Sequence, residues 1–280
     1  MDGYVDIDYD RCDSCGKCVS SCPKGVLQTC SLRSRRYVAP VRWFLCDGCK
    51  ACMGACDRQA VEAGPLSPSF EEHTTCYFRE AGPKNTLQIC RLVAEEVKAG
   101  AKHVVVSSTS GSTALLMARE LQGLKAKLLV FTIPPAWSKI YPYPSIPQET
   151  RKMIEDLGAK VMDGVSPAIS CGPETINCST SYGTLDRKLR KAPSYVVWEL
   201  LHGIGGQGLP TAVDAIFTAV KEGEVPLGSE TIGVGGTGCG ADTAILMRAT
   251  PYEEMLSGPL EHRFNIIRII AAPAEKRWYW

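Results

Sequence analysis

Two runs of cysteine in the first part of the chain have the residue type and spacing to bind metal. Nine of the 14 cysteines fall within residues 1–56. The first run begins CDSCGKC, and the second, CDGCKAC, repeats it 34 residues later. The runs comprise Cys12, Cys15, Cys18 and Cys22, then Cys46, Cys49, Cys52 and Cys56. Because dense cysteine in a reducing compartment more often binds metal than forms disulfides, the runs predict metal sites.

The spacing within each run favours iron–sulfur clusters over zinc. Three thiolates separated by two residues can wrap one short loop around three corners of a four-iron cluster, and the fourth thiolate must approach from elsewhere. Zinc is the alternative, since CxxC pairs also bind it, but zinc sites normally separate two such pairs by a longer loop. Two symmetric runs of four cysteines therefore predict two [4Fe-4S] clusters.

On these eight cysteines, the N-terminal segment resembles the bacterial-type two-[4Fe-4S] ferredoxins. In that family the fourth cysteine of each run binds the cluster of the other run. The resemblance implies one cluster on Cys12, Cys15, Cys18 and Cys56, and a second on Cys46, Cys49, Cys52 and Cys22. It also implies an α+β ferredoxin-like fold and electron transfer. The second run departs from the family at Asp57, where proline is usual, which changes a turn but removes no ligand.

Short strands are expected beside the two runs. Tyr4–Asp8 alternates apolar and polar residues, as a half-buried strand does, and further strands are expected at Val26–Leu27 and Ala60–Val61. Between the runs, Ser31–Tyr37 forms a basic, hairpin-like insert that together with Arg42 carries four arginines. The insert is either a solvated loop or a docking patch for an acidic redox partner.

A change in composition divides the chain into two domains. Residues 64–74 contain prolines, serines and a glycine and read as a linker between a ferredoxin domain at 1–63 and an α/β domain at 75–280. Alternating strands and helices in the second domain predict three layers with a mainly parallel sheet. Strands are expected at 102–107, 127–132, 159–162, 231–234 and 266–271, and helices at 113–121, 148–157 and 211–222.

The second domain resembles the C-terminal domain of pyruvate kinases over roughly residues 75–273, in the free-standing form that some prokaryotes fuse to other modules. The resemblance is carried by Tyr77–Thr86 before a long helix, by Ser107–Ala114 after a strand, and by the glycine-rich segment 233–244. It implies the fold but no kinase activity, because in pyruvate kinases the reaction takes place in a barrel domain that has no counterpart here.

Two loops of this domain are candidates for binding a small anionic metabolite, because hydroxyls and N–H groups at a helix start favour anions. The residues are Ser108, Ser110, Gly111, Ser112 and Thr113 in one loop, and Gly235, Gly236, Thr237, Gly238 and Asp242 in the other. Both loops are expected at the carboxyl ends of strands, facing one crevice. The serines could instead cap a helix, and the glycines could serve close packing.

Other patterns leave alternatives open. Two segments, 203–208 and 233–238, match GxGxxG, but the residues that follow the second are short for the helix of a dinucleotide-binding unit. Cys171, Cys178 and Cys239, with His202, could form a third metal site, although separate structural thiols fit their spacing better. Aromatic residues in 133–147 and 277–280 suit an interface, with a partner or in an oligomer, or packing on their own domain.

Composition excludes several classes of protein. The chain of 280 residues is 45% hydrophobic and 22% charged, as in soluble globular proteins, and its net charge of +1 does not predict a nucleic-acid binder. No apolar run approaches the ~18 residues of a membrane helix, and the acidic start predicts no signal peptide. We therefore expect a cytoplasmic protein, in an anaerobe because such clusters are oxygen-labile. Electron transfer is the leading function; a ligand-gated redox module and a redox enzyme are the alternatives.

Overall fold

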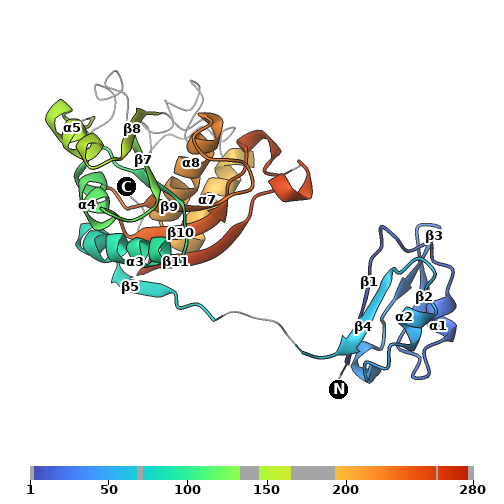
Figure 1. Ribbon diagram of the computed structural model, residues 1–280. Coiled ribbons are helices and arrows are strands. Elements are labelled where there is room, and N and C mark those ends of the chain that lie inside the picture. The colour runs from blue at the N-terminus through green and yellow to red at the C-terminus, as the bar shows by residue number, and fades with distance from the viewer. Residues whose placement is uncertain (1–2, 68–71, 133–144, 165–192, 257, 277–280) are drawn as a thin grey trace. The chain divides into compact units, whose positions relative to one another are not determined.

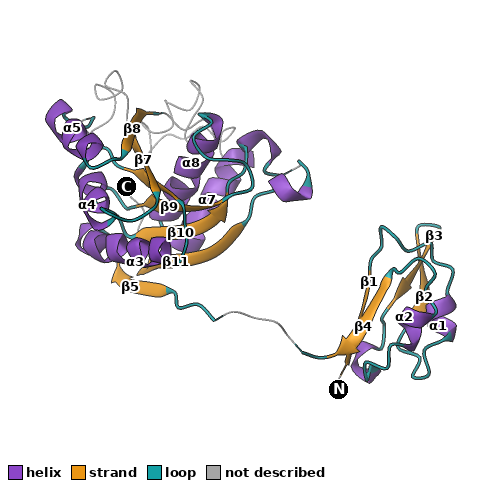
Figure 2. Ribbon diagram, in the orientation of Figure 1, coloured by secondary structure: helices purple, strands orange, loops and turns teal. Residues whose placement is uncertain are grey.

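The computed structural model describes residues 3–67, 72–132, 145–164, 193–256 and 258–276. The chain divides into two compact units, Met1–Glu72 and His73–Trp280. Figure 1 shows the elements of both units, and Figure 2 distinguishes helices from strands. Among the described residues, no helix combines the length and apolar character needed to cross a membrane. Cys171, Cys178 and most of the aromatic segments lie outside the described residues.

Two small antiparallel sheets and two short helices form the N-terminal unit. Strand β1 (Gly3–Ile7) pairs with β4 (Val61–Pro65), and β2 (Gln28–Leu32) pairs with β3 (Arg35–Ala39). The other elements are α1 (Lys17–Ser20), the 3-10 helix η1 (Trp43–Leu45) and α2 (Ala51–Gly54). The small core contains Val5, Ile7, Val26, Leu27, Val38, Val61 and Ala63 together with two cysteines, Cys18 and Cys52.

The basic insert forms a tight hairpin, with Arg33 and Ser34 connecting β2 to β3. Both turn residues have positive φ, 45° and 68°, as a two-residue type I′ turn requires. The strand expected at Val26–Leu27 is displaced. Those two residues are buried, 2% exposed each, and the strand begins after them at Gln28. Val26 and Leu27 therefore contribute side chains to the core and do not take part in strand pairing.

The sequence repeat is also a repeat of backbone conformation. Apart from the hairpin turn, three positions of the first half have positive φ, and each recurs 34 residues later in the second half. The pairs are Ser14 and Gly48, Gly16 and Lys50, and Gly25 and Gln59. Because residues other than glycine seldom adopt positive φ, matching strained positions indicate that both runs fold in the same way.

A seven-stranded, mostly parallel sheet forms the centre of the C-terminal unit, in the order β5-β11-β10-β9-β6-β7-β8. Four of its six pairings are parallel and the two made by β10 are antiparallel. The strands are β5 (Cys76–Glu80), β6 (His103–Ser107), β7 (Lys127–Thr132), β8 (Lys160–Asp163), β9 (Glu230–Gly235), β10 (Thr243–Arg248) and β11 (Ile266–Glu275).

Helices cover both faces of this sheet, giving three layers (Figures 1 and 2). Val104 and Val106 of β6 pack into the core beneath α3 (Thr86–Lys98), α4 (Ser112–Glu120) and α5 (Gln148–Asp156). Val105, between them, packs into the opposite core with α7 (Pro193–Gly205) and α8 (Gly208–Lys221). Alternate strand residues therefore bury their side chains on opposite faces. Three further 3-10 helices are η2 (Pro83–Asn85), η5 (Tyr252–Glu254) and η6 (Leu260–His262).

The residues after the second GxGxxG segment, which are short for the helix of a dinucleotide-binding unit, form a strand. β10 occupies Thr243–Arg248 and pairs antiparallel with β9. The loop at 236–242 therefore closes a hairpin. The other GxGxxG segment, 203–208, joins α7 to α8. Neither segment joins a strand to a helix, so neither has the context of a dinucleotide fingerprint.

Candidate metal centre

The two cysteine runs each fold as an open loop that leads into a single helical turn. Cys18 lies in α1 and Cys52 in α2, and these thiols are 5% and 7% exposed. Cys15 and Cys49, at the middle of each loop, are exposed, and the other four cysteines are partly buried. Equivalent cysteines thus have equivalent burial in the two halves. Along each loop, the cysteines therefore range from exposed through partly buried to buried.

A cavity brings cysteines of both runs together. Its lining includes Cys46, Cys49 and Cys52 from the second run and Cys22 from the first. Apolar side chains of Val5, Val26, Leu27 and Ala63 complete much of the wall, and the empty space, including its opening to solvent, is about 330 Å³. The four thiols are those that the resemblance to two-cluster ferredoxins assigned to one cluster.

The remaining four cysteines are also neighbours, and they too combine three cysteines of one run with the fourth cysteine of the other. Burial raises the pKa of Cys18, and negative charge on Cys12, Cys56 and Cys15 would raise it further. Burial likewise raises the pKa of Cys52, with smaller contributions in the same direction from Cys22 and Cys46. Each buried thiol therefore interacts with a fourth cysteine from the opposite run. Metal binding would reverse this preference, because coordination stabilises the thiolate.

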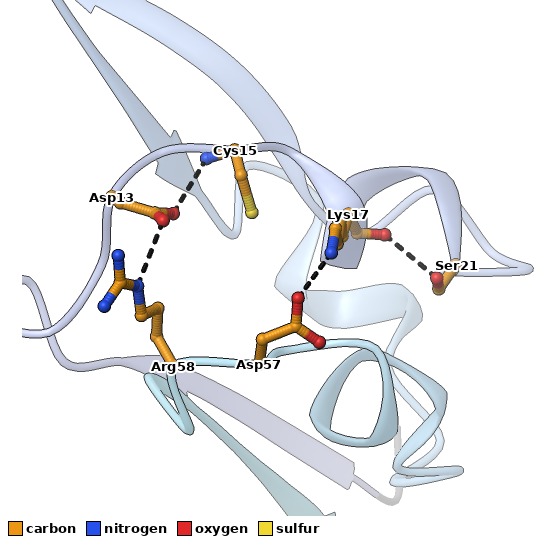
Figure 3. A network of polar contacts seen from close by, with 6 residues as sticks. All are labelled: Asp13, Cys15, Lys17, Ser21, Asp57 and Arg58. Carbon is orange, nitrogen blue, oxygen red and sulfur yellow. Dashed lines mark hydrogen bonds and ion pairs between the residues drawn. The ribbon is translucent and has the colours of Figure 1, made fainter.

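Crossed ion pairs connect the loop of each run to the end of the other. Arg58 Nε lies 3.2 Å from Asp13 Oδ2, and at the equivalent place Lys24 Nζ lies 3.0 Å from Asp47 Oδ2. Each aspartate also accepts a 3.2 Å hydrogen bond from a backbone N–H two residues on, at Cys15 or Cys49. Figure 3 shows the first of these networks. The basic residue follows the fourth cysteine by two positions, so each pair holds that cysteine near the opposite loop.

Backbone N–H groups point at two of the thiols. Val26 N donates to Cys22 Sγ at 3.3 Å, and Ala60 N donates to Cys56 Sγ at the same distance. Both donors follow their cysteine by four residues. Hydrogen bonds to cluster sulfurs stabilise the more negative, reduced state and are one of the main determinants of its potential.

One ion pair breaks the symmetry of the two halves. Lys17 pairs with Asp57, the residue that replaces the proline of the first run, and Ser21 Oγ donates to Lys17 O at 2.9 Å (Figure 3). The repeat equivalents of Lys17 and Asp57 are Ala51 and Pro23, which carry no charge. The side chains of Lys17 and Asp57 are 57% and 75% exposed, so the pair contributes little to stability. Its effect is an added dipole beside the loop of the first run.

The residues present suit a cluster better than a single ion. A zinc ion needs four thiolates within ~2.3 Å of one point. Among the described residues, no three or more His, Cys, Asp or Glu side chains are grouped to hold one metal ion. Four of the thiols, those of Cys22, Cys46, Cys49 and Cys52, instead line a cavity. His202, offered above for a third site, is 2% exposed and its Nε2 lies 2.6 Å from Gln207 Oε1, while Cys239 is exposed.

The serine loop lies where β6 leads into α4. Ser108 and Thr113 are buried, whereas Ser110 and Ser112 are exposed and their hydroxyls lie 3.2 Å apart. Gly111 occupies the N-cap position, with φ 85°, and no side chain caps the helix from there. A Cβ at Gly111 would lie 2.8 Å from Thr150 Cγ2, so this glycine allows α5 to approach.

Asp242 in the glycine loop has a structural role. Its carboxylate is fully buried and accepts hydrogen bonds from Gly82 N at 2.9 Å, Thr237 N at 3.1 Å and Thr243 Oγ1 at 3.0 Å. Both carboxylate oxygens are therefore used within the fold. The bond to Gly82 spans 160 residues of sequence. No local pattern could have revealed it.

Close packing explains two glycines of this loop. A Cβ at Gly235 would lie 2.2 Å from Gly208 O, and one at Gly236 would lie 2.1 Å from Gly240 O. Gly238 has φ 77°, a conformation that favours glycine in a turn. Because β6 and β9 are parallel neighbours, the serine and glycine loops leave the sheet at the same edge. At that edge, backbone atoms occupy the space beside the glycines of this loop.

A comparison with protein families supports the interpretation of the first run. A family described as a 4Fe-4S binding domain matches residues 4–27. This range covers most of β1, the first cysteine run and α1, including Cys12, Cys15, Cys18 and Cys22. Together with the cavity and the crossed contacts, the match indicates that these cysteines bind an iron–sulfur cofactor. The N-terminal unit therefore contains an iron–sulfur domain of the ferredoxin type.

Proposed function

We propose that the chain is an electron-transfer protein that carries two [4Fe-4S] clusters. The first would be held by Cys12, Cys15, Cys18 and Cys56, and the second by Cys46, Cys49, Cys52 and Cys22. The observation that carries the proposal is the cavity where Cys22 of the first run joins three cysteines of the second. Such clusters accept and donate single electrons. Two of them in one small unit provide a short path between a donor and an acceptor.

The residues around the thiols support that role. Val5, Val26 and Leu27 surround the cavity with apolar surface, which limits water near a cofactor and influences its potential. The N–H groups of Val26 and Ala60 supply hydrogen bonds to sulfur. The crossed ion pairs of Asp13 and Asp47 fix the loops around the site. No described side chain is needed as an acid or base in this function.

The C-terminal unit would dock the electron carrier to a redox partner or anchor it in a larger oxidoreductase complex. We propose that this unit shares its ancestry with the C-terminal domain of pyruvate kinases but has no kinase activity. Its mostly parallel sheet with helices on both faces suits that resemblance. Common descent of a fold does not carry over an activity whose site lies in another domain.

A ligand-gated redox module is the second candidate, favoured by the position of the serine and glycine loops at one edge of the sheet. A phosphorylated or carboxylated metabolite bound there would change docking or cluster potential. Asp242 is already used by backbone donors, so the exposed hydroxyls of Ser110 and Ser112 would have to supply most of the contacts. Thermal unfolding with inorganic phosphate and with small carboxylates tests this candidate, since a bound ligand raises the midpoint.

Anaerobic reconstitution with iron and sulfide tests the leading function. We expect about eight iron atoms per chain and, after reduction, the EPR signals of two interacting cubanes. The control is a chain in which Cys15 and Cys49 are both replaced by serine, which should bind less iron while leaving the C-terminal unit folded. A colourless product that contains zinc, or reduced protein without cubane signals, would refute the proposal.

A further inference from the structure

An apolar surface strip lies directly before the second cysteine run. Val41, Trp43, Phe44 and Leu45 are 44%, 56%, 50% and 39% exposed, although all four are large and apolar. We call residues 41–45 the aromatic strip. Contiguous exposed apolar residues are uncommon on monomers and mark interaction sites. Tryptophan and arginine, both in this strip, are the residues most often found at the energetic centres of protein interfaces.

The aromatic strip has a fixed conformation and reaches the cysteine cavity. Leu45 N and Cys46 N donate to Arg42 O at 2.9 Å and Trp43 O at 3.0 Å, which closes the 3-10 helix η1. Arg42 N donates to Val26 O at 3.1 Å, which fastens the strip to the core. Leu45 also lines the cavity beside Cys46. One layer of side chains therefore separates a docked protein from the second set of cysteines.

The internal repeat provides a comparison within the same molecule. The residues before Cys12 that are equivalent to the aromatic strip are Ile7, Asp8, Tyr9, Asp10 and Arg11. In that segment Ile7 is buried, Tyr9 is the one large exposed apolar residue, and Arg11 Nε pairs with Asp8 Oδ2 at 3.2 Å. Holding a cluster therefore does not require a run of exposed apolar residues at this position. The aromatic strip belongs to the second half alone, and some other interaction must explain it.

The charges near the aromatic strip select an acidic partner. Arg42 and Lys50 pair with no carboxylate among the described residues, and Lys50 borders the cavity. The hairpin that carries the other arginines contacts the first run, where Ser14 Oγ donates to Arg36 O at 2.8 Å. Residues 73–280 carry 22 Lys and Arg against 20 Asp and Glu, so the chain's second unit has no net negative charge.

We propose that the aromatic strip, with Arg42 and Lys50, is the docking surface for an acidic redox protein, and that the second cluster exchanges electrons there. This inference rests on the proposed electron-transfer function. In the exchange, one reduced cluster loses one electron and the partner's cofactor gains it. Apolar contact at the centre provides affinity, and the surrounding cations guide the encounter.

An acidic flavodoxin, whose flavin accepts one electron, is the probe. The reduced, reconstituted protein is mixed anaerobically with oxidised flavodoxin, and the flavin absorbance gives the second-order rate constant. The double variant Trp43→Ser/Phe44→Ser should lower this constant by about tenfold or more, the effect of losing at least one interface hot spot. Arg42→Glu should lower it at low salt and weaken its salt dependence. The matched control is Tyr9→Ser, at a residue that is also 56% exposed, and its rate constant should stay within about twofold.

EPR of each reduced variant separates the two levels of the proposal. Absence of clusters in the wild-type protein would refute the electron-transfer function itself. If the clusters are intact, the docking inference is overturned when wild-type protein fails to reduce flavodoxin, when the double variant reduces it as fast, or when Tyr9→Ser slows it equally. A change from dimer to monomer in the double variant, measured by light scattering, would assign the strip to self-association and likewise overturn the inference.

Discussion

Arg58 reaches across the internal repeat to Asp13, with Nε 3.2 Å from Oδ2, and so places the residue two positions after Cys56 against the loop that begins at Cys12. Lys24 and Asp47 repeat this relationship on the other side at 3.0 Å. Two exposed ion pairs contribute little stability, but their position is informative. The fourth cysteine of each run is held beside the three cysteines of the other.

This crossed arrangement predicts how pairs of cysteine substitutions combine. Cys22→Ala/Cys46→Ala removes two ligands from one proposed cluster, so about four iron atoms and one cubane signal should remain. Cys22→Ala/Cys12→Ala removes one ligand from each cluster and should damage both. Iron analysis and EPR after anaerobic reconstitution measure the difference. The two double variants are matched because Cys12 and Cys46 are equivalent in the repeat. The reverse result would show that each run holds its own cluster.

The asymmetric pair of Lys17 and Asp57 should make the potentials of the two clusters unequal. Replacing Asp57 with asparagine removes a negative charge near the first cysteine loop, which favours the reduced state and raises that potential. Lys17→Met should lower it. Through solvent, at roughly 10 Å, each change is on the order of 10–20 mV. A redox titration followed by EPR measures both clusters, and the second serves as the internal control. Equal shifts of both clusters would contradict this assignment.

The sequence predicted the features that depend on neighbouring residues. Cysteine spacing indicated the iron–sulfur domain, and runs such as 127–132, which β7 occupies without change, located strands. It assigned no strand to TAILMR at 243–248, because a short, mostly apolar segment is compatible with a buried strand or a buried helix. The segment is a strand because it pairs antiparallel with β9, which the local sequence does not reveal. The bond from Gly82 N to Asp242 depends on tertiary structure, so the sequence showed Asp242 only as a polar residue of the glycine loop.

The two GxGxxG segments should respond in opposite directions to the same substitution. Gly235→Ala would place a methyl group 2.2 Å from Gly208 O and 2.8 Å from Ala212 N, so α8 must move away from β9. We expect a loss of about 2 kcal/mol or more in the free energy of unfolding. Gly203 in α7 has no atom within 4 Å of an added Cβ, so Gly203→Ala should stabilise the protein by about 0.5–1 kcal/mol. Urea unfolding of the full chain checks both.

Gly235 and Gly203 each belong to one of the two GxGxxG segments. If Gly235→Ala leaves stability unchanged, the close approach of β9 to α8 cannot be the reason for glycine there. A ligand role for the loop would then regain support.

The stability of the C-terminal unit should fall as the pH drops below about 6.5, the ordinary pKa of histidine. Burial lowers the pKa of His202 in the folded state, and burial followed by repulsion from Lys127 and Lys102 lowers that of His103. Between the folded and unfolded pKa values, the unfolded chain binds more protons, so acid favours unfolding. The loss ends once the pH is below the folded pKa values. Hydrogen exchange in peptides from α7 and α8, corrected for intrinsic rates, measures this at pH 7.5 and 5.5.

The variant His202→Gln removes the buried titrating group while keeping a side chain that can bond to Gln207. Its α7 and α8 peptides should therefore lose less protection on acidification than those of the wild type. His262→Gln is the control, because His262 is only partly buried and pairs with Glu254, which lies outside α7 and α8. If His202→Gln keeps the full wild-type dependence on pH, a group other than this imidazole takes up the proton when the helices open.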